Sequence, residues 1–276
     1  MDTLQAIILG IVQGLAEYLP ISSSGHLEIC QDLLGLDLSG AKALEFDLML
    51  HVATVLSTLV ILWKEFVPLC KSFFTLKNDA NTSYVLKILF SCIPVAVVGL
   101  CFKDTIEGFF GSNLLIVGIC LCVTALLLSF TYFKRTDPLT AETYTPKPIG
   151  WTDAFVIGCA QAVAVLPGLS RSGSTIATGI LLGNRKEDVA KFSFFMVIIP
   201  ILGEALLDIK DMIKPAADAV AAEPVIGFVP MLAGFIASFV VGCLACKWML
   251  KIVKEGKLVW FAIYCAVIGA ACIIFS

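Results

Sequence analysis

Six long apolar stretches constrain the fold of this chain more than any other feature. Each has about 18 or more residues with few charges, which is about the length of a helix that crosses a bilayer. In water these stretches would have no polar face to expose. They are residues 46–63, 85–102, 114–133, 189–207, 225–246 and 258–275. Because 59% of the residues are hydrophobic and the mean hydropathy is +0.95, we expect an all-α polytopic membrane protein with six full spans.

Two further apolar regions, residues 4–36 and 151–182, are each interrupted by Pro, Gly and Ser. The interruptions lie at residues 19–26 and 166–174. On either side only about 10 to 16 residues remain, too few to cross a core of about 30 Å at about 1.5 Å per residue. We therefore expect two re-entrant helical hairpins. The alternative is a single kinked span followed by a tail.

The two interrupted regions are related in sequence. A shift of 148 residues, the distance from Gly10 to Gly158, superposes six identical residues without a gap. The matched pairs are Gly10/Gly158, Gln13/Gln161, Ala16/Ala164, Ser22/Ser170, Ser24/Ser172 and Gly25/Gly173. An internal repeat with broken helices is typical of folds that place their ligand site at the middle of the membrane.

Each half contains one hairpin followed by three spans, and an odd number of crossings inverts the second half. The prediction is a single membrane domain of two inverted repeats, residues 1–133 and 151–276, joined by a linker at 134–150. Lys and Arg gather in the loops on one side of this topology, for example at 64–77 and 247–257. The positive-inside rule makes that side cytoplasmic, so both termini should lie outside.

The serine clusters predict an anion site. Irregular backbone at membrane depth is tolerated only where protein buries it or a water-filled cavity borders it. Serine is a favoured N-cap, and the free N–H groups and the dipole of a helix N-terminus attract anions. Two such termini facing one cavity suit a ligand with several negative oxygens, such as a diphosphate. The serines concerned are Ser22, Ser23, Ser24, Ser170, Ser172 and Ser174.

Charged side chains near the interruptions extend this hypothesis. An arginine inside an apolar segment is costly and usually functional, and the planar fork of Arg171 suits phosphate oxygens. Glu17 shares a helix face with Gln13 one turn earlier, so it could act as a general base or pair structurally with Arg171. His26, directly after the serines, could give acid or base help to phosphoryl transfer, although a lone buried histidine is more often structural.

His51 lies four residues after Asp47, so the two can pair on one helix face, either lining the cavity or bracing the helix. The sequence has no zinc motif, P-loop or dinucleotide fingerprint, and no metal-ligating set is predicted. The eleven cysteines read as small buried hydrophobic residues.

Two segments resemble the signature motifs of the bacterial undecaprenyl-diphosphate phosphatase family, which is associated with bacitracin resistance. They are residues 13–27, QGLAEYLPISSSGHL, and residues 167–175, PGLSRSGST. The likeness extends to residues 46–47 and 192–200. It implies an integral enzyme of the bacterial cell membrane that removes the terminal phosphate of a C55 isoprenyl diphosphate and so recycles the lipid carrier of cell-wall synthesis. It also implies an active site that faces the extracytoplasmic side.

The resemblance implies roles for individual residues. Ser23 matches the proposed nucleophile, Glu17 and His26 the acid/base and supporting groups, and Arg171 the phosphate clamp. Ser170 and Thr175 match further motif positions. Gln13 replaces the Glu found in the form of the motif with two acids, which weakens any scheme in which two carboxylates bind a divalent cation, Mg or Ca, as a cofactor.

Two other classes of protein share parts of this pattern. A lipid phosphatase class with a histidine nucleophile needs a second histidine shortly after its arginine, and this chain has none beyond residue 51. A transporter or flippase would bind the head group with the same residues without cleaving it. The expected partners are the C55 diphosphate lipid, membrane lipids and a second copy in a homodimer, with no nucleic acid.

Overall fold

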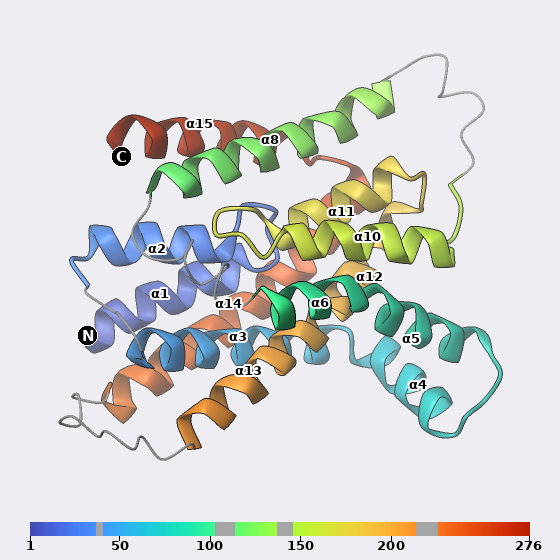
Figure 1. Cartoon of the computed structure of the whole chain (residues 1–276), viewed down its shortest axis with the longest axis horizontal. Coiled ribbons are helices and arrows are strands. Elements are labelled where there is room, and N and C mark those ends of the chain that lie inside the picture. Colours follow the sequence, from blue (N-terminus) through green and yellow to red (C-terminus); the bar gives the residue numbers. More distant parts are fainter. Residues whose placement is uncertain (37–40, 103–113, 137–145, 214–225) are drawn as a thin grey trace.

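The computed structural model describes residues 1–36, 41–102, 114–136, 146–213 and 226–276. Within these ranges every regular element is a helix, apart from one isolated bridge between Lys147 and Asn184. The predicted all-α class is therefore confirmed. Most of the helices run along the long axis of the molecule, and both chain termini lie at the same end (Figure 1).

The first interrupted region folds as two short helices, α1 (Thr3–Ala16) and α2 (Ser23–Leu33). A capping box starts α1, because the Asp2 carboxylate accepts from the Gln5 amide N–H at 2.7 Å and the Gln5 side chain accepts from Asp2 N–H at 2.8 Å. The chain leaves the helix around Pro20, and Ser22 caps α2 by accepting from the Gly25 N–H at 3.3 Å. In Figure 1, α2 runs back alongside α1.

The second interrupted region repeats this arrangement as α10 (Trp151–Val163) and α11 (Arg171–Leu181). Ser170 caps α11 by accepting from the Gly173 N–H at 3.0 Å. Gly168 turns the chain with φ +85°, a conformation that favours glycine. Figure 1 shows this hairpin reaching inward from the end opposite to that of α1 and α2.

The two interruptions touch each other at the centre of the molecule. Ser172 Oγ donates to the Leu19 carbonyl oxygen at 3.1 Å. A Cβ added at Gly25 would lie 3.0 Å from the Cα of Gly168, so only a residue without a side chain allows this approach. The serine-rich N-termini of α2 and α11 therefore belong to one central region.

The remaining described helices surround the hairpins. They are α3 (Ala41–Ile61), α4 (Trp63–Phe74), α5 (Ala80–Ser91), α6 (Ile93–Cys101), α8 (Leu114–Thr136), α12 (Lys186–Met196), α13 (Ile198–Ile213), α14 (Phe228–Glu255) and α15 (Val259–Phe275). The predicted linker at 134–150 lies largely outside the described residues.

In the described part of the chain, three helical segments are long and apolar enough to cross a membrane: Ala80–Cys101, Leu114–Phe133 and Phe228–Glu255. A fourth span results if Glu45–Ile61 and Trp63–Phe74, which are bent by 89° at Leu62, count together. The helix Val259–Phe275, at 17 residues, is slightly shorter. The predicted count of six spans is thus matched only in part.

Proline explains two breaks that the prediction of continuous spans passed over. Pro94 and Pro200 lack an N–H, and each ring crowds the carbonyl four residues earlier. A helix accordingly ends just before each of them, at Ser91 and at Met196. The apolar stretch 189–207 is therefore two helices, α12 and α13.

Small residues let α1 and α14 pack backbone against backbone. A Cβ added at Gly14 would meet the Ser238 carbonyl oxygen at 2.6 Å and the Gly242 amide nitrogen at 2.9 Å. Gly10 faces the backbone of Gly234 in the same way. Small residues at helix contacts are typical of membrane proteins, where packing replaces the hydrophobic effect. This contact fixes α1, and with it Glu17 at its C-terminal end.

Candidate active site

Glu17 is the centre of a hydrogen-bonded group of polar side chains. Ser23 Oγ donates to Glu17 Oε2 at 3.0 Å, and Gln13 Nε2 donates to the same oxygen at 3.0 Å. The Glu17 side chain is only 7% exposed. A serine hydroxyl within hydrogen-bond reach of a buried carboxylate is the geometry of a nucleophile and its general base.

The backbone places the Ser23 hydroxyl. Ser23 is the first residue of α2, and the preceding Ser22 has φ 71°, a left-handed conformation that costs a serine roughly 1–3 kcal/mol and clusters at functional sites. Ser22 is 3% exposed, and its Oγ lies 3.4 Å from that of Ser24. The Ser22 turn therefore directs the next side chain back toward the end of α1.

His51 approaches the same carboxylate from α3. Its Nδ1 donates to the main-chain oxygen of Asp47 at 2.7 Å, and its Nε2 lies 3.8 Å from Glu17 Oε2. A carbonyl oxygen only accepts, so Nδ1 carries the proton. Of the two alternatives for His51, the hydrogen bond to the Asp47 main-chain oxygen fits a residue that braces its own helix, and His51 is not among the residues that line the cavity described next.

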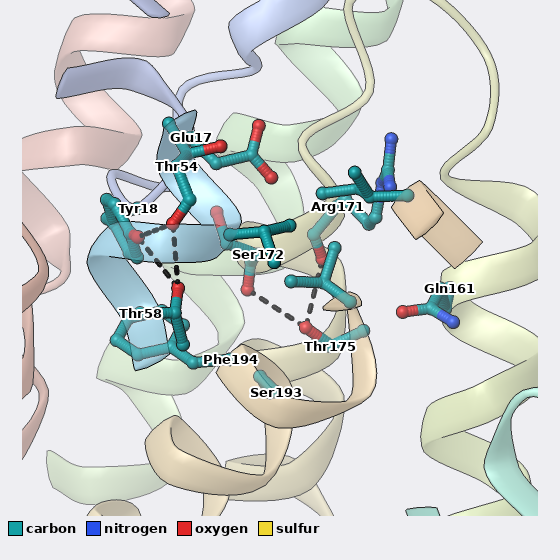
Figure 2. Close-up of a pocket in the computed structure, with 13 residues that line it drawn as sticks. Glu17, Tyr18, Thr54, Thr58, Gln161, Arg171, Ser172, Thr175, Ser193 and Phe194 are labelled. Atoms are coloured by element: carbon teal, nitrogen blue, oxygen red, sulfur yellow. Dashed lines mark hydrogen bonds between the residues drawn. The ribbon is translucent and has the colours of Figure 1, made fainter. Parts of the chain in front are cut away.

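Glu17 and Arg171 line one cavity from opposite hairpins (Figure 2). Tyr18 lies beside Glu17 and is held by a 2.6 Å hydrogen bond to the Thr54 carbonyl oxygen. The other lining residues are Val55, Thr58, Gln161, Ser172, Thr175, Ser193, Phe194, Val197 and Ile201. The cavity volume is about 10 Å³, which is about enough for one water. A diphosphate therefore enters only if these side chains move apart.

Among the described residues, no carboxylate lies within ion-pair distance of Arg171. The alternative in which Arg171 pairs structurally with Glu17 is therefore not seen in this structure. A guanidinium at a mostly buried cavity without a carboxylate partner is suited to bind an external anion.

The polar side chains of the second interruption mainly support the backbone. Ser170 Oγ caps α11 and is fully buried, and Thr175 Oγ1 donates back to the Arg171 carbonyl oxygen at 3.0 Å. Ser172 links the two hairpins. The Ser174 hydroxyl is buried and has no hydrogen-bond partner among the described residues. Of these four residues, Ser172 and Thr175 line the cavity.

His26 lies on the other side of the first interruption. Its Nδ1 donates to the Ser22 carbonyl oxygen at 2.8 Å, which leaves Nε2 to accept from the Tyr264 hydroxyl at 2.8 Å. The two rings stack with centroids 5.6 Å apart and planes inclined by 18°. Sequence reasoning missed Tyr264, because it is an unremarkable aromatic residue inside an apolar helix.

An apolar groove of about 450 Å³ begins at this histidine. Apart from His26 and Tyr264, its lining is hydrophobic: Val12, Leu15, Ala16, Leu19 and Ile21 from the first hairpin, and Trp260 and Phe261 from α15. The groove thus joins an apolar surface to the polar residues of the first interruption.

The carboxylates of the site do not form a cation site by themselves. Glu17 is the one acidic side chain among the cavity-lining residues, and no group of three potential metal ligands occurs in the described residues. Its neighbour Gln13 supplies a neutral amide. The donor set offers too few oxygens for Mg²⁺ or Ca²⁺ unless a ligand adds its own.

Comparison with known proteins gives one consistent result. The family model described as bacitracin resistance protein BacA matches residues 6–271. A protein of Bacteroides fragilis named undecaprenyl-diphosphatase is 55% identical over 276 residues, covering 100% of this chain and 99% of the relative. Proteins of the same name from Parabacteroides distasonis (55% identical; 98% and 96% covered) and Methanosphaera stadtmanae (36%; 100% and 99%) are also similar.

Proposed function

Because the chain belongs to the BacA family of bacitracin resistance proteins, we propose that it is an undecaprenyl-diphosphatase, an integral membrane enzyme that hydrolyses undecaprenyl diphosphate to undecaprenyl phosphate and inorganic phosphate. This reaction returns the lipid carrier to peptidoglycan synthesis and accounts for bacitracin resistance. The observation that carries the proposal is the Ser23–Glu17 hydrogen bond at a cavity that also holds Arg171.

In the first step, Ser23 Oγ attacks the terminal phosphorus while Glu17 takes its proton. The bond between that phosphorus and the bridging oxygen breaks, and undecaprenyl phosphate leaves. In the second step, water attacks the phosphoserine, the bond from phosphorus to Ser23 Oγ breaks, and Glu17 returns its proton to Ser23. Both water protons leave with the phosphate product. Gln13 keeps Glu17 oriented throughout by donating to Oε2.

Arg171 and the free N–H groups of the two helix N-termini neutralise the phosphates. Phosphoryl transfer depends mainly on positioning and on stabilising charge. Arg171 is the first residue of α11 and lines the cavity, and the N-termini of α2 and α11 lie at the contact between the hairpins, which supports this role. Ser22, Ser24, Ser170, Ser172, Ser174 and Thr175 shape the two turns that present these groups.

The groove beside His26 suits the prenyl chain. Its lining is apolar and ends at the only described histidine of the first hairpin, one turn of α2 beyond Ser23. A lipid whose tail lies there places its head group at the N-terminus of α2. His26 then lies beside the diphosphate, where a protonated imidazole would give its Nε2 proton to the departing bridging oxygen and regain one from solvent.

The membrane arrangement is part of the proposal. The two halves form inverted repeats, with six spans and two re-entrant hairpins in the bacterial cell membrane. The loops rich in Lys and Arg face the cytoplasm, and the site opens to the extracytoplasmic side. The entry of the two hairpins from opposite ends of the molecule supports this topology. We further propose that any Mg²⁺ or Ca²⁺ is bound through substrate phosphates, and that the protein can form a homodimer.

The apolar helices would suit a flippase as well as an enzyme. A flippase would not need a serine hydroxyl that donates to a buried carboxylate, as Ser23 does to Glu17. The similar proteins are named for hydrolysis, not transport, so the flippase alternative is not supported.

The direct test is phosphate release from undecaprenyl diphosphate by purified protein in detergent, where transport cannot occur. We expect Ser23→Ala, Glu17→Gln and Arg171→Ala each to lower the rate by about 100-fold or more, as removal of one stabilising donor does in other enzymes. Ser129→Ala on α8, which removes a hydroxyl bonded only to the Ala125 carbonyl oxygen, is the matched control. Rates near wild type in both Ser23→Ala and Arg171→Ala would refute the assignment.

A further inference from the structure

Gln161 on α10 is a buried amide whose hydrogen bonds are not made. It is 0% exposed, and neither Nε2 nor Oε1 has a hydrogen-bond partner among the described residues. A buried polar group without a partner costs roughly 1–3 kcal/mol, and a glutamine here has two of them. Gln161 lines the same cavity as Glu17, Thr175 and Arg171 (Figure 2).

The internal repeat explains why the amide is unused. Gln161 matches Gln13, whose Nε2 donates to Glu17 four residues later. The residue four after Gln161 is Val165, which cannot accept. The thiol of Cys92 lies close to the Gln161 side chain, but sulfur is a weak acceptor and the thiol proton goes to the Met196 carbonyl oxygen at 3.5 Å. The second glutamine has therefore kept its place with no strong internal partner.

Ser193 adds a second group of the same kind. It is 3% exposed, its Oγ has no partner among the described residues, and it lines the cavity from α12. The space in the cavity is about 10 Å³, and a single water needs about that volume and two to four polar partners. The Gln161 amide and the Ser193 hydroxyl supply those partners.

We propose that Gln161 and Ser193 hold the water that hydrolyses the phosphoserine in the second step of the reaction. Gln161 Oε1 and Ser193 Oγ accept the two water protons in hydrogen bonds, which turns an oxygen lone pair toward the phosphorus on Ser23. The water oxygen forms the new bond to phosphorus, and the bond to Ser23 Oγ breaks. This inference rests on the proposed function, because it needs Ser23 as nucleophile.

The test separates the two steps of the reaction. In Gln161→Met, which keeps the volume and removes the amide, we expect undecaprenyl phosphate to form in the first turnover within about 2-fold of the wild-type rate. Phosphate release should slow by about 10-fold or more, the effect of roughly one hydrogen bond, and a phosphorylated enzyme should accumulate. Acid quenching with a substrate labelled in the terminal phosphate measures released phosphate and phosphorylated enzyme, and the loss of label from the lipid measures the formation of undecaprenyl phosphate. Mass spectrometry locates the label on Ser23.

Two variants serve as companions. Ser193→Ala should likewise leave undecaprenyl phosphate formation nearly unchanged and slow phosphate release. Gln31→Met on α2, outside the cavity lining, should leave both steps unchanged. Equal slowing of both products in Gln161→Met, without phosphoenzyme, would overturn the role of Gln161. Formation of undecaprenyl phosphate tests Ser23 separately. If Ser23→Ala forms no undecaprenyl phosphate while Gln161→Met changes neither step, this inference is refuted and the proposed function stands.

Discussion

At the scale of single residues, the site is built from contacts between side chains that are close in sequence and a few that are distant. Gln13, Glu17 and Ser23 lie within one hairpin. Tyr264 comes from elsewhere and fixes the orientation of His26, while His51 from α3 lies close to Glu17. Distant partners of this kind set the geometry of the catalytic groups more narrowly than the hairpin alone could.

Tyr264 provides a residue-scale prediction. Tyr264→Phe keeps the ring stacked on His26 and removes only the hydroxyl that donates to His26 Nε2. A net contribution of about 0.5–1.5 kcal/mol for such a bond should lower kcat/KM by about 2- to 10-fold. The steady-state rate with undecaprenyl diphosphate measures the effect. Tyr84→Phe, whose ring packs edge-on against Phe192 at 5.7 Å and outside the cavity lining, is the control, and equal rates in the two variants would contradict the role.

Sequence reasoning reached the short-range part of this site. The interruption motifs and the repeat predicted that Gln13, Glu17, the serines and Arg171 belong together, and the structure brings Glu17 and Arg171 to one cavity. It gave no sign of Tyr264, because a hydrogen bond across 238 residues follows from how α15 packs. Gln161 was visible as a repeat match, but its lack of a partner appears only when the positions of Val165 and Cys92 are known.

At the scale of helices, local chemistry predicted where the hairpins turn. The Pro, Gly and Ser clusters end α1 and α10, and the serine caps begin α2 and α11. The same reasoning treated residues 85–102 and 189–207 as continuous helices, although a break near Pro94 and another near Pro200 divide them. Mean hydropathy measures whether a segment suits lipid, but it does not report whether the helix is interrupted within that segment.

The contact between α1 and α14 gives an element-scale prediction. Gly14→Ala places a Cβ within 2.6 Å of the Ser238 carbonyl oxygen, so the helices must move apart at a cost of about 1–3 kcal/mol. The unfolding temperature in detergent should fall, and activity should fall with it, since α1 carries Glu17. Gly99→Ala on α6 meets nothing within 4 Å and should leave the unfolding temperature unchanged or raise it. Equal unfolding temperatures would show that the contact is looser than described.

At the scale of the whole molecule, the arrangement of the two ends can be checked on α15. Lys257 precedes this helix with its side chain 63% exposed, and Ser276 follows it. If the proposed topology holds, a membrane-impermeant thiol reagent applied to intact cells should label Ser276→Cys and should label Lys257→Cys only after permeabilisation. The parent protein for both variants would have its native exposed cysteines, such as Cys101, replaced. Labelling of both positions from outside would rule out the proposed orientation.

The contact between the two interruptions also bears on whether one half of the chain could work alone. In the proposed mechanism the nucleophile and its base come from the first hairpin and the guanidinium from the second, and the helix that carries the base is seated against α14. Residues 1–133 expressed without the rest of the chain would then lack both a full set of reacting groups and the surface that supports Glu17.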